Sequence, residues 1–281
     1  MVAGAIYALV AASFSIIYAT NKFLHVAHGA VLALNTYFLY FFFTVLGLNF
    51  VLSVLLTMLA AALVGFTISK FYKQLRDKQA SSATLLLGSI ALMIFIDSLI
   101  LLLFEGNTKT IGLLKVAQGI ELFQAIITPL QISIIVLSLF VLLVLSLFIK
   151  KSRLGTTLRA VADTPEQAEI LGISANQVYT ASFIIGSIVA TLAGILYGLE
   201  HNLTPTMGIK LVFTGFAAAV VGGIGSIQGA VLGASLFSLV ENFGIWYIPS
   251  GYKDALVFIV LFLFLTLRPH GIFGFKNKIP L

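Results

Sequence analysis

The stretch that decides the fold is Lys150–Gln177, KKSRLGTTLRAVADTPEQAEILGISANQ, the longest polar interval in the chain. Apolar runs of membrane-spanning length flank it, so the interval itself should lie outside the bilayer. Leu158, Val161 and Ala162 would share one face of a short helix, and Pro165 prevents that helix from continuing. The interval therefore predicts a helix, a break and a second helix.

The second of these helices has a recognisable start and stop. Thr164 can cap the free backbone N–H groups, Pro165 suits the first turn, and Gln167 stands where a capping-box partner belongs. Gly172 follows Leu171 as a left-handed stop, which limits the helix to about two turns. A helix this short is unstable alone in water, so we expect it to lie against other protein.

The same interval carries a small apolar face, made by Ala160, Ala168, Ile170 and Leu171. Two interpretations of this face stay open from the residues alone. It belongs to an ordinary loop that rests on its own domain, or it is a docking surface for another protein.

Composition places the chain among membrane proteins that cross the bilayer several times. Hydrophobic residues make up 60% and charged residues only 9%, whereas soluble domains carry about 25% charged residues. The chain has no cysteine, which excludes disulfides, thiol catalysis and cysteine metal sites.

The distribution of the charges behind the net charge of +6 indicates membrane topology rather than nucleic-acid binding. The cations gather in three intervals: Lys70, Lys73, Arg76 and Lys78; Lys150, Lys151, Arg153 and Arg159; and Arg268, Lys276 and Lys278. The positive-inside rule places all three intervals on the cytoplasmic side. Glu105–Pro129 and Glu200–Lys210 then lie on the opposite side.

The apolar segments predict an all-α bundle of about eight or nine membrane helices, counting short or re-entrant ones. The candidates are Val2–Ala19, Ala30–Leu48, Val51–Lys70, Thr84–Phe104, Leu130–Ile149, Val178–Leu199, Leu211–Val221, Ala230–Ile248 and Ala255–Leu267. The first has no basic region or small-residue cleavage site, so we interpret it as a retained span rather than a signal peptide. The whole chain, residues 1–281, is expected to form a single transmembrane domain.

Two glycine-containing breaks predict irregular backbone at membrane depth. Leu211–Val221 is too short to span unaided and runs into the glycines at 222, 223 and 225, while Asn21–Gly29 separates two other apolar runs. The sequence after each break is similar, HGAVLA from His28 and QGAVLG from Gln228. Broken segments at corresponding positions are typical of a transport pathway, so we expect hinge or irregular backbone at Gly29, Gly222, Gly223 and Gly225.

Polar residues inside the apolar segments are the candidates for lining that pathway. They are His28, Asn35, Asp97, Thr214, Glu241 and Asn242. Acids at this depth are costly and usually face a bundle interior or water, although a hydrogen-bonded neutral Asp97 and a paired Glu241 stay open as structural alternatives. His25 and His28 favour hydrogen bonds over a metal site, because two ligands alone underspecify one.

Catalytic motifs are absent from the sequence. It contains no GxxxxGK[ST] phosphate loop, no HExxH and no GxSxG. We therefore expect no enzymatic activity and no cofactor in this chain, and uphill transport would take its energy from another protein.

Taken together, several stretches resemble the permease subunits of bacterial ABC importers for branched-chain amino acids, the LivH-like group, with urea and amide permeases nearby. They are GAIYALVA (residues 4–11), AHG (27–29), LRAVADTPEQAEILGI (158–173), GGIGSIQGAVLGASL (222–236), Glu241, YKD (252–254) and RPHGIFG (268–274). The resemblance covers almost the whole chain.

The resemblance implies an ABC importer permease fold in the bacterial inner membrane. It also implies the partners: a second permease subunit, two cytoplasmic ATPases that bind ATP, a periplasmic solute-binding protein and the lipid bilayer, with no nucleic acid. The interval at residues 150–177 then resembles the loop that couples such permeases to their ATPases. The coupling residues it implies are Arg159, Ala160, Asp163, Glu166, Ala168, Glu169 and Gly172. Gln167 departs from the fuller EAA signature of many ABC permeases.

Two other functions stay open at this stage. A urea or short-amide permease would have the same architecture, and a self-sufficient transporter coupled to protons would use Asp97, Glu241 and His28. A third possibility, a membrane-embedded enzyme, has no support, because the sequence shows no set of catalytic residues.

Overall fold

The computed structural model describes residues 1–113, 119–122, 125–244, 246–247, 249–268 and 271–273. Its helices are α1 (Val2–Asn21), α2 (His28–Tyr40), α3 (Phe50–Asp77), α4 (Ser82–Phe104), α5 (Pro129–Lys151), α6 (Arg153–Asp163), α7 (Pro165–Ile170), α8 (Ala175–Glu200), α9 (Met207–Gly222), α10 (Ile227–Gly244) and α11 (Lys253–Leu267). A π-helical turn, Phe41–Val45, extends α2, and β1 (Ile120–Leu122) pairs antiparallel with β2 (Ala125–Ile127).

Six of these elements are long and apolar enough to cross a membrane: α1, α2 with its π-helical turn, α3, α4, α5 and α8. The pair α9–α10 and the shorter α11 account for the remaining apolar segments. Each of the predicted segments thus corresponds to a helix, and the all-α membrane fold is confirmed. The sequence did not predict that α3 continues beyond Lys70 to Asp77 or that a short hairpin precedes α5.

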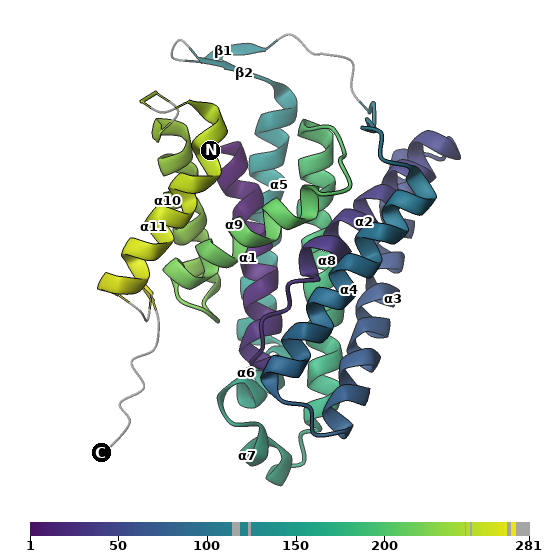
Figure 1. Cartoon of the computed structure of the whole chain (residues 1–281), viewed down its shortest axis with the longest axis vertical. Coiled ribbons are helices and arrows are strands. Elements are labelled where there is room, and N and C mark those ends of the chain that lie inside the picture. The colour runs from purple at the N-terminus through teal and green to yellow at the C-terminus, as the bar shows by residue number, and fades with distance from the viewer. Residues whose placement is uncertain (114–118, 123–124, 245, 248, 269–270, 274–281) are drawn as a thin grey trace.

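Helix α1 forms the centre of the bundle (Figure 1). It packs against α5, α8, α9 and α10, and the run from Leu9 to Ala12 is fully buried. A helix that is apolar on all sides has no face that prefers water, which suits this central position. The outer helices differ, because Leu63, Leu102 and Phe140 expose 66%, 80% and 61% of their surface. In a membrane those outer faces meet lipid.

The two ends of the bundle carry different elements. Figure 1 places α6, α7 and the turn between α3 and α4 at one end, which we call the α7 end, and the N-terminus and the hairpin at the other. The basic intervals around residues 70–78 and 150–159 therefore share one end, as the charge pattern predicts. Of the third predicted interval, Lys276 and Lys278 lie outside the described residues.

The break after α9 turns the chain sharply, with an angle of 117° between α9 and α10. Gly223 and Gly225, both predicted as irregular backbone, have positive φ values of 105° and 90°, a conformation that side chains with a Cβ rarely adopt. Helix α10 runs toward the end of the bundle that carries the N-terminus, which is also the end at which α8 finishes (Figure 1). The pair is therefore a re-entrant element, not a straight span.

Two glycine contacts hold α9 in place. Gly208 near its start lies against Gly29 in the first turn of α2, and Gly222 at its end lies against Gly229 in the first turn of α10. A Cβ on any of the four would collide with a backbone carbonyl of its partner glycine. The similarity between the sequences after the two breaks thus has a structural counterpart, since each supplies a glycine for one end of α9.

The segment after α11 supplies backbone hydrogen-bond donors to the end of α9, at the break between α9 and α10. The backbone N–H of Ile272 donates to the carbonyl of Val221 at 2.9 Å, and the N–H of Phe273 donates to the carbonyl of Gly222 at 3.0 Å. The last carbonyls of a helix have no partner within it, and inside a membrane they need one. The motif near the C-terminus therefore stabilises the glycine-rich break.

The Gly208 contact makes a testable prediction about stability. Gly208→Ala places a methyl group against the Gly29 carbonyl, and such overpacking costs about 1–3 kcal/mol. We expect a lower midpoint of thermal unfolding for the purified protein, followed by tryptophan fluorescence or scanning fluorimetry. Gly251→Ala is the control, because a Cβ there meets no atom within 4 Å. Equal midpoints for the two variants would contradict the contact.

Candidate functional site

The α7 end is built around a small hydrophobic core of its own. Its buried members are Leu158, Val161, Ala168, Ala175 and Val178. They come from α6, α7 and the first turns of α8, so these three segments pack together as one unit, which we call the coupling unit. Leu158 and Val161 lie on the same buried face, as their spacing predicts.

Most of the predicted coupling residues are exposed on this unit: Arg159, Asp163, Glu166, Glu169 and Gly172, with Ala160 partly buried. Ala168 is different, because only 2% of it is exposed. The grouping of Ala168 with Ile170 and Leu171 on one face is therefore wrong, and Ala168 fits the alternative in which the face rests on its own domain. Helix α7 turns its alanine inward and leaves Ile170 and Leu171, which are 85% and 78% exposed, at the surface.

The local signals around α7 are borne out in part. Pro165 occupies its first turn, and Gly172 adopts the left-handed conformation with φ of 81°. The N–H of Gly172 donates to the carbonyl of Glu169, and the N–H of Ile173 donates to that of Ala168. The predicted cap by the Thr164 side chain is absent. Local sequence thus predicts both ends of α7, although the side chain of the N-cap residue makes no capping hydrogen bond.

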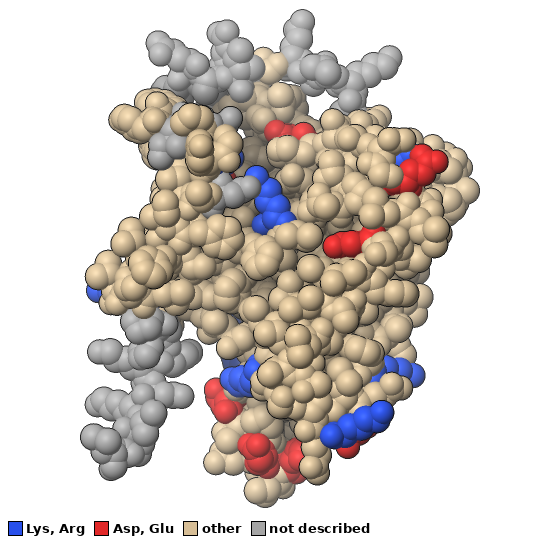
Figure 2. Space-filling view, viewed as in Figure 1, with Lys and Arg blue, Asp and Glu red and all other residues tan. Residues whose placement is uncertain are grey.

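Charged side chains of both signs gather at the α7 end, below a wide band that is largely uncharged on the visible face (Figure 2). The coupling unit therefore presents two large aliphatic side chains amid charged neighbours, Glu166 and Glu169 among them. An apolar centre with a polar rim is the usual anatomy of a protein–protein contact.

A cluster of buried and partly buried polar groups connects the coupling unit to the break between α1 and α2. The Arg76 guanidinium donates to Asn21 Oδ1 at 2.6 Å and lies 4.0 Å from the centre of the Tyr179 ring. The Asn21 amide nitrogen donates in turn to Ser182 Oγ at 2.9 Å. Asn21 ends α1, Arg76 lies in the last turns of α3, and the other two lie near the start of α8. We call these four residues the polar joint.

Further contacts hold the break itself. His25 Nδ1 lies 3.1 Å from the Tyr72 hydroxyl, and the Tyr72 ring stacks on Phe183 of α8. The backbone N–H of Ala27 donates to Ser89 Oγ on α4 at 2.9 Å. The break between α1 and α2 is thus fixed by side chains from α3, α4 and α8. The contact of His25 with Tyr72 agrees with the prediction that this histidine is hydrogen-bonded.

The predicted pathway residues do not converge on one place. His28 and Asn35 are fully buried: His28 Nε2 lies 2.8 Å from Ser13 Oγ of α1, and the Asn35 amide donates to the Val31 carbonyl in its own helix. Asp97 lies on α4 and is partly exposed, with one buried carboxylate oxygen that has no hydrogen-bond partner among the described residues. Asn242 donates to the Ser238 carbonyl in its own helix.

Glu241 is fully buried near the end of α10. The Tyr7 hydroxyl donates to its carboxylate at 3.1 Å, and Lys253 Nζ lies 3.4 Å from the same carboxylate. These partners join α1, α10 and the first residue of α11. Glu241 is therefore paired with Tyr7 and Lys253, as the structural alternative expects, and this pairing accounts for a carboxylate in an apolar helix.

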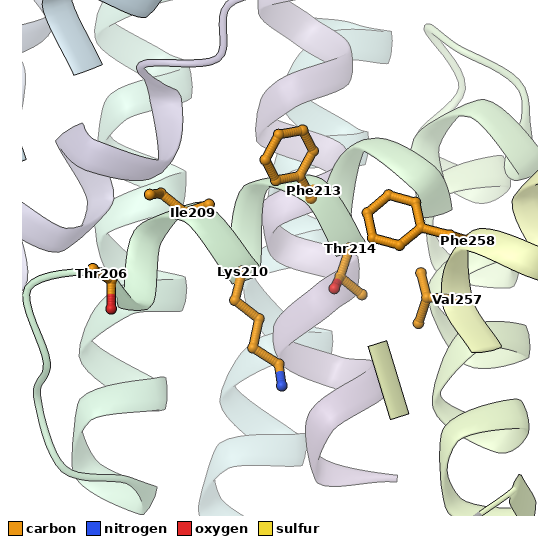
Figure 3. Close-up of a pocket in the computed structure, with 7 residues that line it drawn as sticks. All are labelled: Thr206, Ile209, Lys210, Phe213, Thr214, Val257 and Phe258. Carbon is orange, nitrogen blue, oxygen red and sulfur yellow. The ribbon is translucent and has the colours of Figure 1, made fainter. Parts of the chain in front are cut away.

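Thr214 is the predicted pathway residue that lines a cavity in the described part of the chain. The cavity, of about 270 Å³, opens between α9 and α11 (Figure 3). Its lining residues are Thr206, Ile209, Lys210, Phe213, Thr214, Val257 and Phe258. Sequence reasoning placed Lys210 at the end of an outer loop, whereas the structure places it in the first turns of α9.

Comparison with known proteins gives the family. Residues 1–265 match the family described as branched-chain amino acid transport system / permease component. The chain is 33% identical to the high-affinity branched-chain amino acid transport system permease protein BraD of Pseudomonas aeruginosa, over 96% of this chain and 92% of that protein. It is 30% identical to LivH of Escherichia coli over the same shares.

A solved structure has the same fold. PsaBC from Streptococcus pneumoniae, in complex with Fab, matches with a TM-score of 0.54 at 14% identity, covering 96% of this chain and 90% of that one. Because the family and its relatives match along nearly the full length, the chain belongs to the family of permease components of branched-chain amino acid transport systems.

Proposed function

We propose that this chain is the transmembrane permease subunit of an ATP-driven importer that carries branched-chain amino acids across the bacterial inner membrane. It pairs with a second permease subunit, is driven by two cytoplasmic ATPases that bind the ATP, and receives its solute from a periplasmic binding protein. The full-length similarity to BraD and LivH supports this class of function.

The observation on this chain that carries the proposal is the pair of exposed side chains Ile170 and Leu171 on the coupling unit. Large aliphatic side chains more than three-quarters exposed, outside the apolar band, are unfavourable in water unless something covers them. A cleft on a soluble ATPase is a suitable cover, because the charged residues around the pair match a wet rim.

The packing supplies a route from this contact to the membrane helices. The coupling unit contains the start of α8, and α8 packs against α1, α2 and α3. Movement of the unit when the ATPases close would therefore be passed to the central helix. ATP can shift the transporter only through contacts that differ between its two states, and the ends of α8 and α1 are where such differences would arise.

The proposed solute fits the chemistry of the chain. An aliphatic amino acid is a zwitterion with an apolar tail, which suits a largely apolar bundle whose buried polar residues are mostly serines and threonines. Urea and short amides are the alternative solutes, and uptake competition decides between them.

The proposal predicts what accompanies the protein and what drives it. Affinity purification of the tagged chain from mild detergent should recover two ATPases and a second permease, identified by mass spectrometry. After reconstitution into liposomes, the recovered complex should take up leucine only when ATP is present on the side of the membrane that the ATPases face and the binding protein is also present. Transport of leucine by the chain alone, without an ATPase, would contradict the proposal and favour a proton-coupled transporter.

A further inference from the structure

We infer that the exposed face of α4 packs against a transmembrane helix of the second permease subunit, which supplies a hydrogen-bond donor to Asp97. This inference rests on the proposed function and adds the surface through which the two subunits meet. Three observations carry it: an acid without a partner on an outer helix, a heptad repeat of small and aliphatic side chains beside it, and the contrast with the outer face of α5.

Asp97 lies well inside the membrane-spanning length of α4. The helix is long and apolar enough to cross a membrane, and Asp97 comes fifteen residues after its first residue and seven before its last. At 1.5 Å per residue, the acid is about 22 Å from one end and about 10 Å from the other. Long basic side chains reach the membrane surface from such a position, but an aspartate is too short to do so.

The carboxylate of Asp97 is not compensated by its own chain. It has no hydrogen bond or ion pair among the described residues, and one of its oxygens is buried without a partner. The residue is partly exposed at the surface of the single chain, and Figure 2 shows acidic atoms over α4 inside the band that is largely uncharged. Acids at membrane depth are costly in lipid and are normally paired. The missing donor therefore comes from outside this chain.

Beside Asp97, the exposed face of α4 has the repeat of a helix that packs on another helix. Two kinds of side chain recur every seven residues, small ones at Thr84, Ala91 and Ser98, and aliphatic ones three positions later at Leu87, Ile94 and Leu101. All six are exposed. Alternating steps of three and four residues keep one seam against a partner helix, and small residues let two membrane helices come close. We call these six residues the α4 seam, and Asp97 lies at its edge.

Helix α5 shows what an outer face toward lipid looks like in this protein. Between Ile134 and Ile149, every exposed residue of α5 is a valine, a leucine or a phenylalanine. Such a face offers neither a groove of small residues nor a polar group. Helix α4 packs chiefly on α2 within its own chain, which leaves the seam uncovered. The α4 face is therefore built for contact with protein.

The chemistry of this face selects a membrane helix as its partner. A lipid tail has no hydrogen-bond donor for Asp97, and water has no apolar surface for the aliphatic half of the seam. A helix that carries small residues and one hydroxyl, amide or cationic side chain opposite Asp97 supplies both. In the proposed assembly the ATPases and the binding protein lie outside the bilayer. The second permease subunit is thus the partner that can cover the seam.

Photo-crosslinking in the assembled transporter, in native membranes, tests the α4 seam. Phe95 flanks the seam and is 63% exposed. A Phe95→p-benzoylphenylalanine substitution should give an adduct with the second permease subunit, identified by mass spectrometry. The same substitution of Phe140 on α5 is the matched control, because that phenylalanine is 61% exposed and should meet only lipid.

Two further substitutions separate a protein cover from a lipid cover. Ala91→Leu adds apolar surface, which lipid accepts, but it blocks the close approach of a helix. We expect about tenfold less second permease subunit to be recovered with the tagged chain, whereas Val136→Leu on α5 should change nothing. Asp97→Leu should reduce recovery by about tenfold, as for the loss of a hydrogen bond to a charged group. Asp97→Asn, which keeps hydrogen-bonding atoms, should retain most of it.

The inference is overturned if the probe at Phe95 reacts with lipid alone or joins two copies of this chain. It is also overturned if recovery of the second permease subunit is unchanged in both Ala91→Leu and Asp97→Leu. ATP-driven leucine uptake by the unsubstituted complex tests the proposed function separately. A complex that imports leucine and contains the second permease, but fails these tests, contradicts the α4 seam alone.

Discussion

Leu171→Glu is expected to lower ATP-driven uptake about 30-fold or more, since removal of a central contact residue typically costs at least 2 kcal/mol of binding. Leu171 is 78% exposed beside Ile170, at the tip of the coupling unit. A carboxylate there would be buried without a partner once the ATPase docks, which adds a desolvation cost to the lost apolar contact. The permease itself should fold normally, because Leu171 makes little contact with its own chain.

The measurement is the amount of ATPase recovered with the tagged variant, together with the rate of leucine uptake. Gln74→Glu is the matched control, because it adds the same charge to an exposed position on α3 near the same end of the bundle. Leu171→Met should retain most of the activity, since it keeps an apolar side chain of similar size. Full recovery of the ATPases with Leu171→Glu would show that docking uses another surface.

Ala168 marks the limit of what the sequence could predict in this region. A helix as short as α7, Pro165–Ile170, has too few residues for its hydrophobic period to define a face. Alanine and isoleucine are both apolar, so composition alone groups Ala168 with Ile170. Only the packing against Leu158, Val161 and Val178 shows that the alanine points inward and the isoleucine outward.

Elsewhere the sequence predicted the structure correctly where the signal was a local motif or a long apolar run. Gly172 and Pro165 set the limits of α7 by backbone conformation, and the long apolar runs became α1 to α5 and α8. The glycine-rich end of α9 predicted the re-entrant break, because irregular backbone is tolerated in a membrane only inside protein. These inferences depend on neighbouring residues and need no tertiary contact.

Two functional candidates were missed for the opposite reason. Arg76 belongs to a basic interval, so it was counted as a cytoplasmic surface charge, whereas the structure turns it inward toward Asn21 and Tyr179. Lys210 precedes an apolar run too short to span, which was a signal that the helix began earlier and included the lysine. The partners of Arg76 lie far away in the sequence, where pattern reasoning has no information.

Arg76→Met is expected to uncouple ATP hydrolysis from uptake. Arg76 joins the end of α1 to the start of α8, through a hydrogen bond of 2.6 Å to Asn21 and a position 4.0 Å from the Tyr179 ring. A hydrogen bond to a charged group contributes about 1.5–3 kcal/mol, and the cation–π contact about 0.5–2 kcal/mol. Methionine keeps much of the apolar stem but removes both interactions. The coupling unit could then move without carrying the end of α1 with it.

The diagnostic quantity is the number of leucine molecules imported per ATP hydrolysed by the purified complex in liposomes. We expect it to fall about tenfold in Arg76→Met, which corresponds to the loss of roughly 1.4 kcal/mol of coupling. Lys73→Met is the control, because it removes an exposed cation from the preceding turn of α3. Arg76→Lys should restore part of the ratio, since an ammonium still interacts with the tyrosine ring but lacks the planar fork of the guanidinium.

The ratio separates a role in coupling from a role in stability alone. If Arg76 only holds the bundle together, its loss reduces the amount of active complex, so that hydrolysis and uptake fall in the same proportion and their ratio stays constant. If the polar joint transmits movement, the ATPases still dock through Ile170 and Leu171 and still hydrolyse ATP, and uptake alone declines. Because Leu171→Glu should remove docking and Arg76→Met should leave it intact, the two variants interrupt the same route at successive points. Their double variant should therefore resemble Leu171→Glu, and an additional loss beyond it would place Arg76 outside that route.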